Sequence, residues 1–600
     1  MSDQIPDSLD LDTLRAAYRA GLKPSVLLEA LLERAENDTR HCWIALTPVE
    51  QLRALASALD AQAPDSLPLY GVPFAIKDNI DLEGLPTTAA CPDFAYMPER
   101  SAEVVERLIA AGALPLGKTN LDQFATGLNG TRSPYGVCLN AFDPAYVSGG
   151  SSSGSAVSVA TAQVSFSLGT DTAGSGRVPA AFNNLVGLKP TRGLISTRGV
   201  VPACRSLDCV SIFALTAEDA ERVYGVALGG DGDPAYARAA EPHGFDFGRA
   251  QGFRFGVPRA EQLQFFGDAA YEALFAEAVT RLEALGGTRC EIDFAPFLDA
   301  ARLLYDGPWV AERYHAIREF IERQPESLLP VIRQIVGAAA SLRSVDAFDA
   351  FYQLAALKRS ADAIWKDVDV VLTPTAGFIP TIEATLAEPV RLNSDLGYYT
   401  NFMNLLDYAA VAMPAGFRAD GLPFGVTLFA PAHQDVPLLH LAARWQRAGA
   451  VTLGATAQPM PPLAAVAPAV PSGQVQLAVC GAHMAGLPLN HQLTERGARL
   501  VCATQSAPAY RFYALAGGPP FRPGMIRVAE GGAAIEVEVW ELPARLFGSF
   551  VAAIPAPLGI GKLELADGRW VPGFICEPGG VVGAADITHH GGWRAYLAQR

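Results

Sequence analysis

Charged residues are scarce in this sequence, and most of them carry the same sign. Only 18% of the 600 residues are charged, and 62 acidic against 46 basic residues give a formal net charge of −16. An acidic protein repels phosphate backbones and anionic headgroups, so we expect neither a nucleic-acid partner nor a membrane partner. The same charge opposes an anionic substrate unless a cation inside the protein receives it.

Paired cysteines, a leader segment and long apolar runs are also missing. The nine cysteines include no Cys-x-x-Cys pair, a pattern typical of reduced thiols in a cytoplasmic protein and not of a metal site. The first residues have neither the basic nor the apolar part of a signal peptide, and no apolar run is long enough to span a bilayer. We therefore expect a cytoplasmic protein without a metal.

Length and composition predict two domains. Six hundred residues exceed one ordinary domain, and half of them are hydrophobic, which excludes a disordered chain. Residues 457–473 are rich in proline and alanine, the composition of a stiff, extended linker. We predict a large domain over residues 1–456 and a smaller one over residues 474–600.

Two turns rich in glycine and serine mark the large domain. The first, Ser148 to Ser155, precedes a helix predicted over 156–163, and the second, Gly169 to Gly176, follows a strand predicted over 164–168. Glycine lets a backbone approach a ligand closely, and serine supplies hydroxyl groups. Three interpretations compete: a phosphate-binding loop, an ordinary structural turn, and a site with a hydrolytic serine.

The phosphate loop is disfavoured, because neither Gly-Lys-Ser/Thr nor Gly-x-Gly-x-x-Gly occurs at these turns. A hydrolytic serine needs a base, and no histidine lies between His41 and His243, so a histidine would have to come from elsewhere in the fold. Lysine is the other base that serine enzymes use. Lys77 stands near the end of an apolar strand predicted over 69–80. From physical chemistry alone it is either an edge charge, the commoner case, or a buried amine with a lowered pKa.

Three motifs surround these residues: Lys77 in G-V-P-F-A-I-K-D-N, Ser151 in G-G-S-S-S-G-S, and Ser175 in G-T-D-T-A-G-S-G-R-V-P-A-A. Together with the following N-L-V-G-L-K-P-T-R-G they resemble the amidase signature family, over roughly residues 10–455. The resemblance implies an α/β fold with a mixed central sheet covered by helices. It also implies an enzyme that hydrolyses carboxamides without a cofactor.

The resemblance further implies a Ser–cis-Ser–Lys triad. Ser175 would be the nucleophile, Ser151 a bridging serine on a cis peptide, and Lys77 the base that draws the proton through Ser151. These roles suit amide hydrolysis, because the carbonyl is a weak electrophile and a hydroxyl both donates and accepts. Backbone N–H groups would bind the oxyanion; their turn consists of Thr172, Ala173, Gly174 and Ser175.

The next candidate is the loop Asn120 to Thr131, which follows a strand predicted over 113–118. In the amidase signature family this loop lines the substrate pocket, so the resemblance places backbone groups of Gly127 and Asn129 against the amide. An ordinary turn of glycine and asparagine is an equal interpretation. Lys118, at the end of the strand before the loop, is interpreted as a solvated strand end and not as a second base.

Tyr305 and Arg313 are eight residues apart, which on one helix places them on the same face. Arg313 can receive a carboxylate in a bidentate pair, or it can pair with an internal acid. This pair is similar to one in the allophanate hydrolases, a branch of the amidase signature family. There the arginine binds the free carboxylate of allophanate, a small anion, and the tyrosine orients it.

Residues 474–600 are predicted to be rich in strands and resemble the C-terminal domain of allophanate hydrolases, an α+β fold like that of γ-glutamylcyclotransferase. In the family this domain is linked to decarboxylation of the first product or to assembly. Its most distinctive residue, His483, is a candidate base or a histidine satisfied by backbone in a turn. Strands are predicted over 474–480, 499–504, 510–516, 524–528 and 534–542.

The resemblance implies hydrolysis of allophanate (urea-1-carboxylate) to ammonia and carbon dioxide through an acyl-enzyme. It also implies a homodimer and assembly with upstream enzymes of urea or cyanurate degradation. A general amidase and an A-type subunit of a glutamyl-tRNA amidotransferase are the alternatives, with the smaller domain as a non-catalytic assembly module.

Overall fold

The computed structural model describes residues 5–230, 235–241, 247, 252–449, 452–461 and 473–600. The chain divides into two compact units, one formed by Met1–Ala240 and Gly252–Leu463 and the other by Glu241–Gln251 and Ala464–Arg600. The predicted linker lies mostly outside the described residues. Within those residues, the search for a helix of sufficient length and apolarity to cross a membrane finds none.

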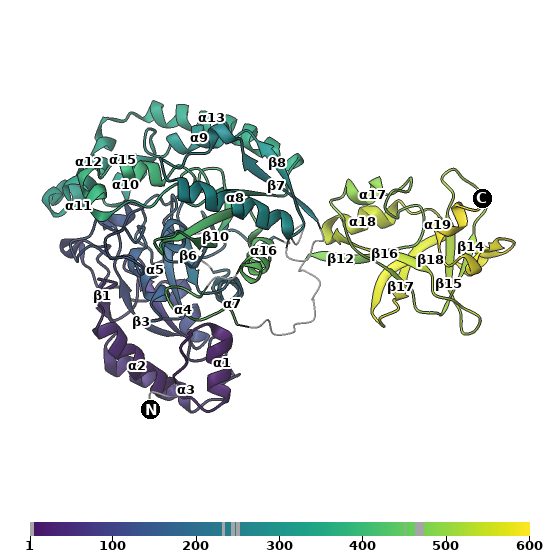
Figure 1. The fold of residues 1–600 in the computed structure, drawn as a ribbon, viewed down its shortest axis with the longest axis horizontal. Coiled ribbons are helices and arrows are strands. Elements are labelled where there is room, and N and C mark those ends of the chain that lie inside the picture. Colours follow the sequence, from purple (N-terminus) through teal and green to yellow (C-terminus); the bar gives the residue numbers. More distant parts are fainter. Residues whose placement is uncertain (1–4, 231–234, 242–246, 248–251, 450–451, 462–472) are drawn as a thin grey trace. The chain divides into compact units, whose positions relative to one another are not determined.

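The first unit is built on a mixed sheet of eleven strands (Figure 1). Strand β2 runs parallel to β3 and β4, and β7 runs parallel to β8 and β9, whereas the other neighbours are antiparallel. The expected mixed central sheet is thereby confirmed. Across the sheet the order is β1 (Trp43–Leu46), β3 (Leu114–Thr119), β2 (Pro73–Lys77), β4 (Phe166–Asp171), β6 (Cys209–Ala214), β5 (Val186–Lys189), β10 (Tyr408–Phe417), β11 (Pro423–Pro431), β9 (Val370–Pro374), β7 (Phe253–Pro258) and β8 (Gly287–Ile292).

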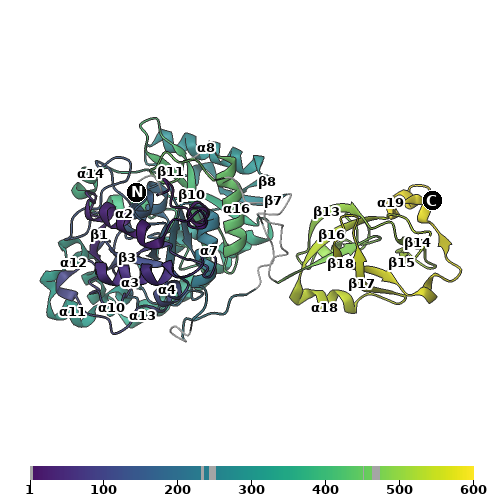
Figure 2. The same cartoon turned by 90° about the horizontal axis from the view of Figure 1, so that it is seen from below.

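The middle of the sheet is covered on both faces. Every residue of β2, β3, β4, β5 and β6 is buried, and strands buried on both faces show apolar runs instead of alternation. The small residues of α5 let this helix pack against β2 and β4. Figures 1 and 2 both show α10, α11 and α12 clustered. The helices are α1 (Leu11–Arg19), α2 (Pro24–Glu36), α3 (Val49–Asp60), α4 (Glu103–Ala110), α5 (Ser153–Ala160), α6 (Val178–Phe182), α7 (Ala217–Ala227), α8 (Ala269–Ala284), α9 (Ala295–Arg302), α10 (Trp309–Ala316), α11 (Arg318–Arg323), α12 (Pro330–Gly337), α13 (Ser344–Ala361), α14 (Ile382–Ala387), α15 (Arg391–Leu396) and α16 (Asp435–Ala448).

The stretch from Tyr305 to Arg313 is not one helix. Helix α10 begins at Trp309, and the residues before it form turns. Gly307 and Pro308 explain the interruption, because proline restricts the residue before it and lacks an N–H for the preceding turn. The two side chains therefore do not meet on a shared helical face. The turns before α10 bring them together.

The second unit has the expected α+β architecture with two small sheets. A five-stranded sheet has the order β13, β16, β12, β18, β17, and a three-stranded sheet the order β15, β14, β19. The predicted strands occur within a few residues of their expected ends. The elements are β12 (Gln474–Val479), α17 (His491–Thr494), β13 (Arg499–Gln505), β14 (Tyr510–Ala514), β15 (Pro523–Arg527), β16 (Glu536–Pro543), α18 (Ala544–Ala552), β17 (Leu558–Glu564), β18 (Trp570–Cys576), β19 (Ala585–Asp586) and α19 (Trp593–Leu597).

Candidate active site

Lys77 and Ser151 meet at the carboxyl end of strand β2. Lys77 is the last residue of this strand, and Ser151 lies just before helix α5, which packs on it. Lys77 Nζ donates a 2.7 Å hydrogen bond to Ser151 Oγ, and the Gly150–Ser151 peptide is cis. Both side chains are fully buried, so the interpretation of Lys77 as an edge charge is wrong.

A second hydroxyl that the sequence analysis missed holds the same amine. Thr170, in strand β4 next to β2, accepts a 2.7 Å hydrogen bond from Lys77 Nζ. Among the described residues no carboxylate oxygen lies within 4.0 Å of Nζ. The sequence signal for this contact was a polar residue within a buried strand, because a buried hydroxyl needs a hydrogen-bond partner. The amine is thus held by two neutral oxygens.

Burial lowers the pKa of Lys77 to about 7, although Asp122, Asp208 and Asp171 act in the opposite direction. An unperturbed lysine titrates at roughly 10.4. A substantial share of this amine is therefore unprotonated at neutral pH, which is the form that accepts a proton.

Lys118 is not solvated, so that prediction is wrong. The residue lies in β3, beside β2, and is fully buried. Its Nζ lies 3.0 Å from Asp78 Oδ1 and donates to Thr87 Oγ1 at 3.0 Å. A buried strand end with a carboxylate partner explains why a lysine is tolerated there.

A buried ion pair fixes the second glycine-rich turn. Arg177 binds Asp171 through Nε and Nη2, each at 2.9 Å. Asp171 also accepts the N–H groups of Gly174, at 2.9 Å, and Gly176, at 3.0 Å. Gly174 has φ of 129°, and a Cβ there would come within 2.4 Å of Thr400 Oγ1. Only glycine fits this position, because it alone tolerates both the conformation and the contact.

Ser175 follows this turn and faces the loop that contains Gly127. Its side chain is buried, and its Oγ donates to the Gly127 carbonyl at 3.5 Å. Within the described residues its hydroxyl makes this hydrogen bond and none to Ser151. The serine therefore lies beside the candidate pocket loop.

One of the four predicted oxyanion donors is occupied. The Gly174 N–H is bound to Asp171, so its assignment as a donor is wrong; the glycine supplies the shape of the turn instead. The N–H groups of Thr172, Ala173 and Ser175 have no acceptor among the described residues. These three groups are the ones that can bind an oxyanion.

The two loop residues differ in what they can offer a substrate. Gly127 has its carbonyl toward Ser175, and a Cβ on Gly127 would meet Asp122 Oδ2 at 2.4 Å. Asn129 is consumed within the loop: its side chain binds Asn393 and Thr131 at 2.9 Å, and its N–H binds Asp122 at 3.3 Å. The loop itself uses the Asn129 N–H, and the expectation that backbone groups of Gly127 and Asn129 hold the amide stays a prediction.

Arg313 of α10 binds the loop that contains Gly127. Its guanidinium donates to Thr126 Oγ1 at 3.1 Å, to the Ala125 carbonyl at 3.3 Å and to Tyr305 Oη at 3.3 Å. It is only 3% exposed. No carboxylate of the described residues lies within 4.0 Å of it, so the alternative of an internal acid as its partner is wrong.

A separate hollow in the second unit contains His483. The cavity has a volume of about 130 Å³. His483 Nε2 lies 3.0 Å from Gln492 Oε1, and the ring stacks on Phe574 with centroids 5.0 Å apart. Burial lowers the pKa of this histidine, with Arg522 acting in the same direction. The ring is held by a side chain, not by backbone as in the turn interpretation.

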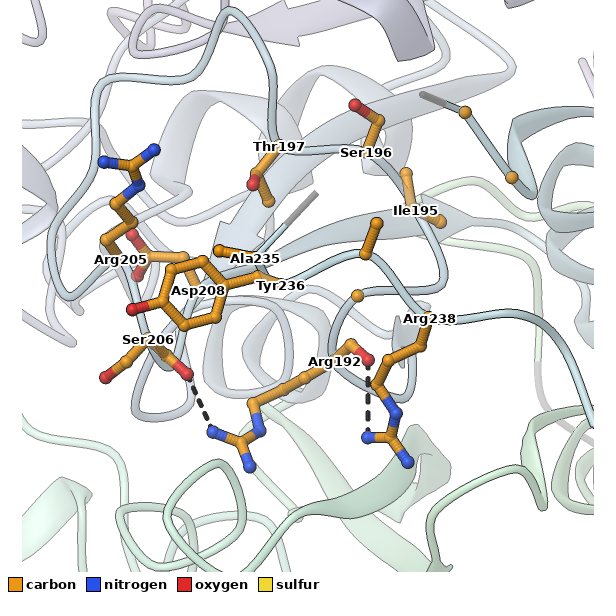
Figure 3. Close-up of a pocket in the computed structure, with 14 residues that line it drawn as sticks. Arg192, Ile195, Ser196, Thr197, Arg205, Ser206, Asp208, Ala235, Tyr236 and Arg238 are labelled. Atoms are coloured by element: carbon orange, nitrogen blue, oxygen red, sulfur yellow. Dashed lines mark hydrogen bonds between the residues drawn. The ribbon is translucent and has the colours of Figure 1, made fainter. Parts of the chain in front are cut away.

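A larger hollow in the first unit has a volume of about 300 Å³, and two of the arginines that line it already have an acidic partner. Figure 3 shows Arg192 and Arg238 lining it next to one another. Both bind Asp407, at 3.2 and 2.9 Å, and Arg192 also donates to the Ser206 carbonyl at 2.7 Å. No group of three or more potential metal ligands occurs among the described residues.

Comparison with known proteins identifies the family to which this fold belongs. Residues 26–439 match the family described as Amidase, and residues 475–598 match the allophanate hydrolase C-terminal domain. A solved structure titled as Kluyveromyces lactis allophanate hydrolase is similar with a TM-score of 0.83 and 42% identity, covering 99% of this chain and 100% of the other. The fold, the match and the buried lysine–serine contact define an amidohydrolase.

Curated relatives sharpen the class. The urea amidolyase of Saccharomyces cerevisiae is 46% identical over 95% of this chain. The A-type subunit of the glutamyl-tRNA(Gln) amidotransferase from Symbiobacterium thermophilum is 34% identical over 66% of this chain and 87% of its own length. The chain belongs to the amidase family, and its second unit is an allophanate hydrolase C-terminal domain. It spans about a third of the length of the urea amidolyases that it matches.

Proposed function

We propose that this protein hydrolyses allophanate and releases ammonia and carbon dioxide. The observation that carries the proposal is Arg313 of α10, a buried guanidinium without a carboxylate within 4.0 Å among the described residues, which binds Thr126 in the loop that faces Ser175. A buried cation without a carboxylate in contact favours a ligand that supplies the opposite charge, although Asp208 and Glu312 already offset part of the cost of burial from a distance. A planar carboxylate matches its fork of donors. The likeness to the allophanate hydrolase of K. lactis supports the same substrate.

In the proposed reaction Ser175 attacks the terminal amide carbonyl of allophanate. Its proton passes through Ser151 to the neutral amine of Lys77 and then to the leaving ammonia. Backbone N–H groups of Thr172, Ala173 and Ser175 bind the oxyanion. Supporting this sequence are the 2.7 Å contact between Lys77 and Ser151 and the pKa of about 7 for the amine.

The acyl-enzyme is then a carboxylated carbamoyl ester on Ser175. Water, deprotonated along the same Ser151–Lys77 path, hydrolyses it to N-carboxycarbamate. Tyr305 and Arg313 hold the carboxylate throughout, which keeps the reacting carbonyl in place. The unstable product loses one carbon dioxide to give carbamate, and breakage of the last carbon–nitrogen bond in carbamate releases a second carbon dioxide and the second ammonia.

We infer that the second unit either accelerates this loss of carbon dioxide or serves assembly. The cavity beside His483, whose pKa is lowered by burial, supports a role as a base. We propose domain limits of 1–456 and 474–600 with a linker over 457–473, consistent with the compositional change and the two compact units.

We propose further that the chain forms a homodimer in the cytoplasm and acts beside an enzyme that supplies its substrate. Helix α13 supports self-association, because Phe348 and Tyr352 are 59% and 70% exposed on it. The nine free cysteines suit a reducing compartment. Fusion in the urea amidolyases is consistent with urea carboxylation as the supplying reaction; cyanurate degradation is the other source.

Ammonia release from allophanate and from the neutral diamide malonamide tests the proposed substrate. We expect wild type to hydrolyse allophanate and Arg313→Ala to lose about 10²-fold or more in kcat/KM for allophanate, with a much smaller loss for malonamide. Wild type that cleaves malonamide but ignores allophanate would leave the amidohydrolase intact and contradict the substrate.

A further inference from the structure

Three arginines of the described chain are almost completely buried. Arg132 and Arg313 are each 3% exposed, and Arg177 is 0% exposed. Arg177 pairs with Asp171, whereas no carboxylate of the described residues lies within 4.0 Å of either other guanidinium. Arg313 already has a part in the proposed function. Arg132 is a second buried cation in the same condition, and the proposed mechanism does not use it.

Arg132 is anchored to the same residue as Arg313. Its Nη1 donates to the Thr126 carbonyl at 2.8 Å and its Nη2 to the Pro389 carbonyl, while its buried Nε has no hydrogen-bond partner among the described residues. Arg313 Nη1 donates to the Thr126 hydroxyl at 3.1 Å. Thr126 is thus held from two sides, by one guanidinium on its backbone and by another on its side chain.

The anchored residue adjoins the reacting serine. Gly127 follows Thr126, and its carbonyl accepts the hydrogen bond of Ser175. Burial lowers the pKa of Arg132, and the charge of Arg313 acts in the same direction, opposed by Asp122 and Tyr305. Both guanidiniums bind Thr126, so they lie close enough for their charges to repel each other, and an anion beside them relieves this repulsion.

We propose that Arg132 is a second determinant of anion selectivity: it positions Thr126 for Arg313 and adds a fixed positive charge to the carboxylate end of the site. It acts as a positioning residue and does not touch the substrate. The inference rests on the proposed function only in placing a carboxylate at Arg313. It predicts that selectivity for an anion over a neutral amide depends on both guanidiniums.

Malonate and malonamide separate charge from loop geometry, because they have the same carbon skeleton and differ in charge. The full-length wild type is compared with Arg132→Met and Arg132→Lys. The readouts are malonate binding by calorimetry and the kcat and KM for malonamide. We expect Arg132→Met to weaken malonate binding about tenfold and to change the malonamide KM less than about threefold. Arg132→Lys keeps the charge and restores a large part of the malonate affinity.

Asn393→Ala is the matched control. Asn393 Oδ1 accepts from Leu128 N at 2.7 Å and from Asn129 Nδ2 at 2.9 Å, so it docks the same loop on the segment that contains Pro389. Its loss loosens the loop without changing charge. We expect malonamide turnover to fall while the preference for malonate persists.

Equal weakening of malonate binding by Arg132→Met and Asn393→Ala would reduce Arg132 to a loop anchor and overturn the inference. So would unchanged malonate affinity in Arg132→Met, or a wild type that binds no malonate. Circular dichroism of each variant checks the fold, and Arg132→Lys keeps the test decisive if Arg132→Met misfolds. A wild type that binds malonate but does not hydrolyse allophanate contradicts the proposed function alone.

Discussion

Strands β2 and β3 each end near a buried lysine, and the two lysines differ in that only one has a counter-ion in contact. Lys77 and Lys118 are both fully buried on adjacent parallel strands. Lys118 Nζ lies 3.0 Å from Asp78, whereas Lys77 Nζ binds the hydroxyls of Ser151 and Thr170. Burial disfavours a charged amine, and a carboxylate at contact distance opposes that effect. The same type of side chain therefore serves in one place as a structural ion, and in the other we propose it as the proton acceptor.

The end of strand β2 creates this difference. Lys77 is the last residue of β2, and Asp78 begins the turn that follows it. The Asp78 carboxylate contacts Lys118 of the neighbouring strand, not the lysine beside it in sequence. The carboxylate nearest in sequence to Lys77 is directed away from it, which leaves burial as the largest influence on its pKa.

Replacement of Lys77 by methionine has the largest expected effect on activity. Lys77→Met keeps most of the buried volume but removes the proton acceptor, so we expect kcat to fall at least about 10³-fold. The fold should persist, because no ion pair is broken and a costly buried amine is removed. Ammonia release and thermal unfolding together check this. Activity within tenfold of wild type would show that another group is the base.

Lys118→Met has the next largest expected effect, and this effect is on folding stability instead of on activity. It leaves Asp78 buried without its ion partner, which costs about 3–5 kcal/mol of folding stability. Urea unfolding of the variant measures the loss, and Lys118→Met combined with Asp78→Asn should recover part of it by removing the orphaned charge. An unfolding midpoint equal to that of wild type would mean that the ion pair contributes nothing.

The residues that sequence motifs identified are those whose chemistry lies in local patterns. Lys77, Ser151 and Ser175 lie in short motifs, and the structure brings the first two into contact. Thr170 was missed because its role depends on strand pairing. Arg132 was missed because its partner Pro389 lies 257 residues away in the chain. Contacts set by loop closure leave no periodic signal, so the counter-ions of buried lysines and arginines required the fold.

The pH dependence of wild-type activity and stability tests the role of Lys77, with a smaller expected effect than either substitution. Because neutral Lys77 is the proposed base and its pKa is about 7, we expect kcat/KM for malonamide to rise with pH and level off above about pH 7.5. The folded pKa is lower than the unfolded value of roughly 10.4, so the unfolded state binds more protons between these values. Stability should therefore rise with pH across that window, and Lys77→Met should remove this part of the rise. A rate that is flat from pH 6 to 9 would contradict this prediction.

Asp208 offers the finest adjustment of this limb. Burial raises its pKa to about 6, and as an anion it favours the protonated form of Lys77. Asp208→Asn removes that charge, so the rising limb should move to lower pH by a few tenths of a unit, on the order expected for a buried charge that is not in contact. Asp435→Asn is the matched control, because Asp435 is also buried and accepts from the N–H and hydroxyl of Thr191, each at 2.7 Å, yet it is not among the charges that act on Lys77. Equal shifts in both variants would mean that the limb reports general loosening of the fold. A shift confined to Asp208→Asn would mean that the amine of Lys77, held without a counter-ion in contact, is tuned by carboxylates at a distance.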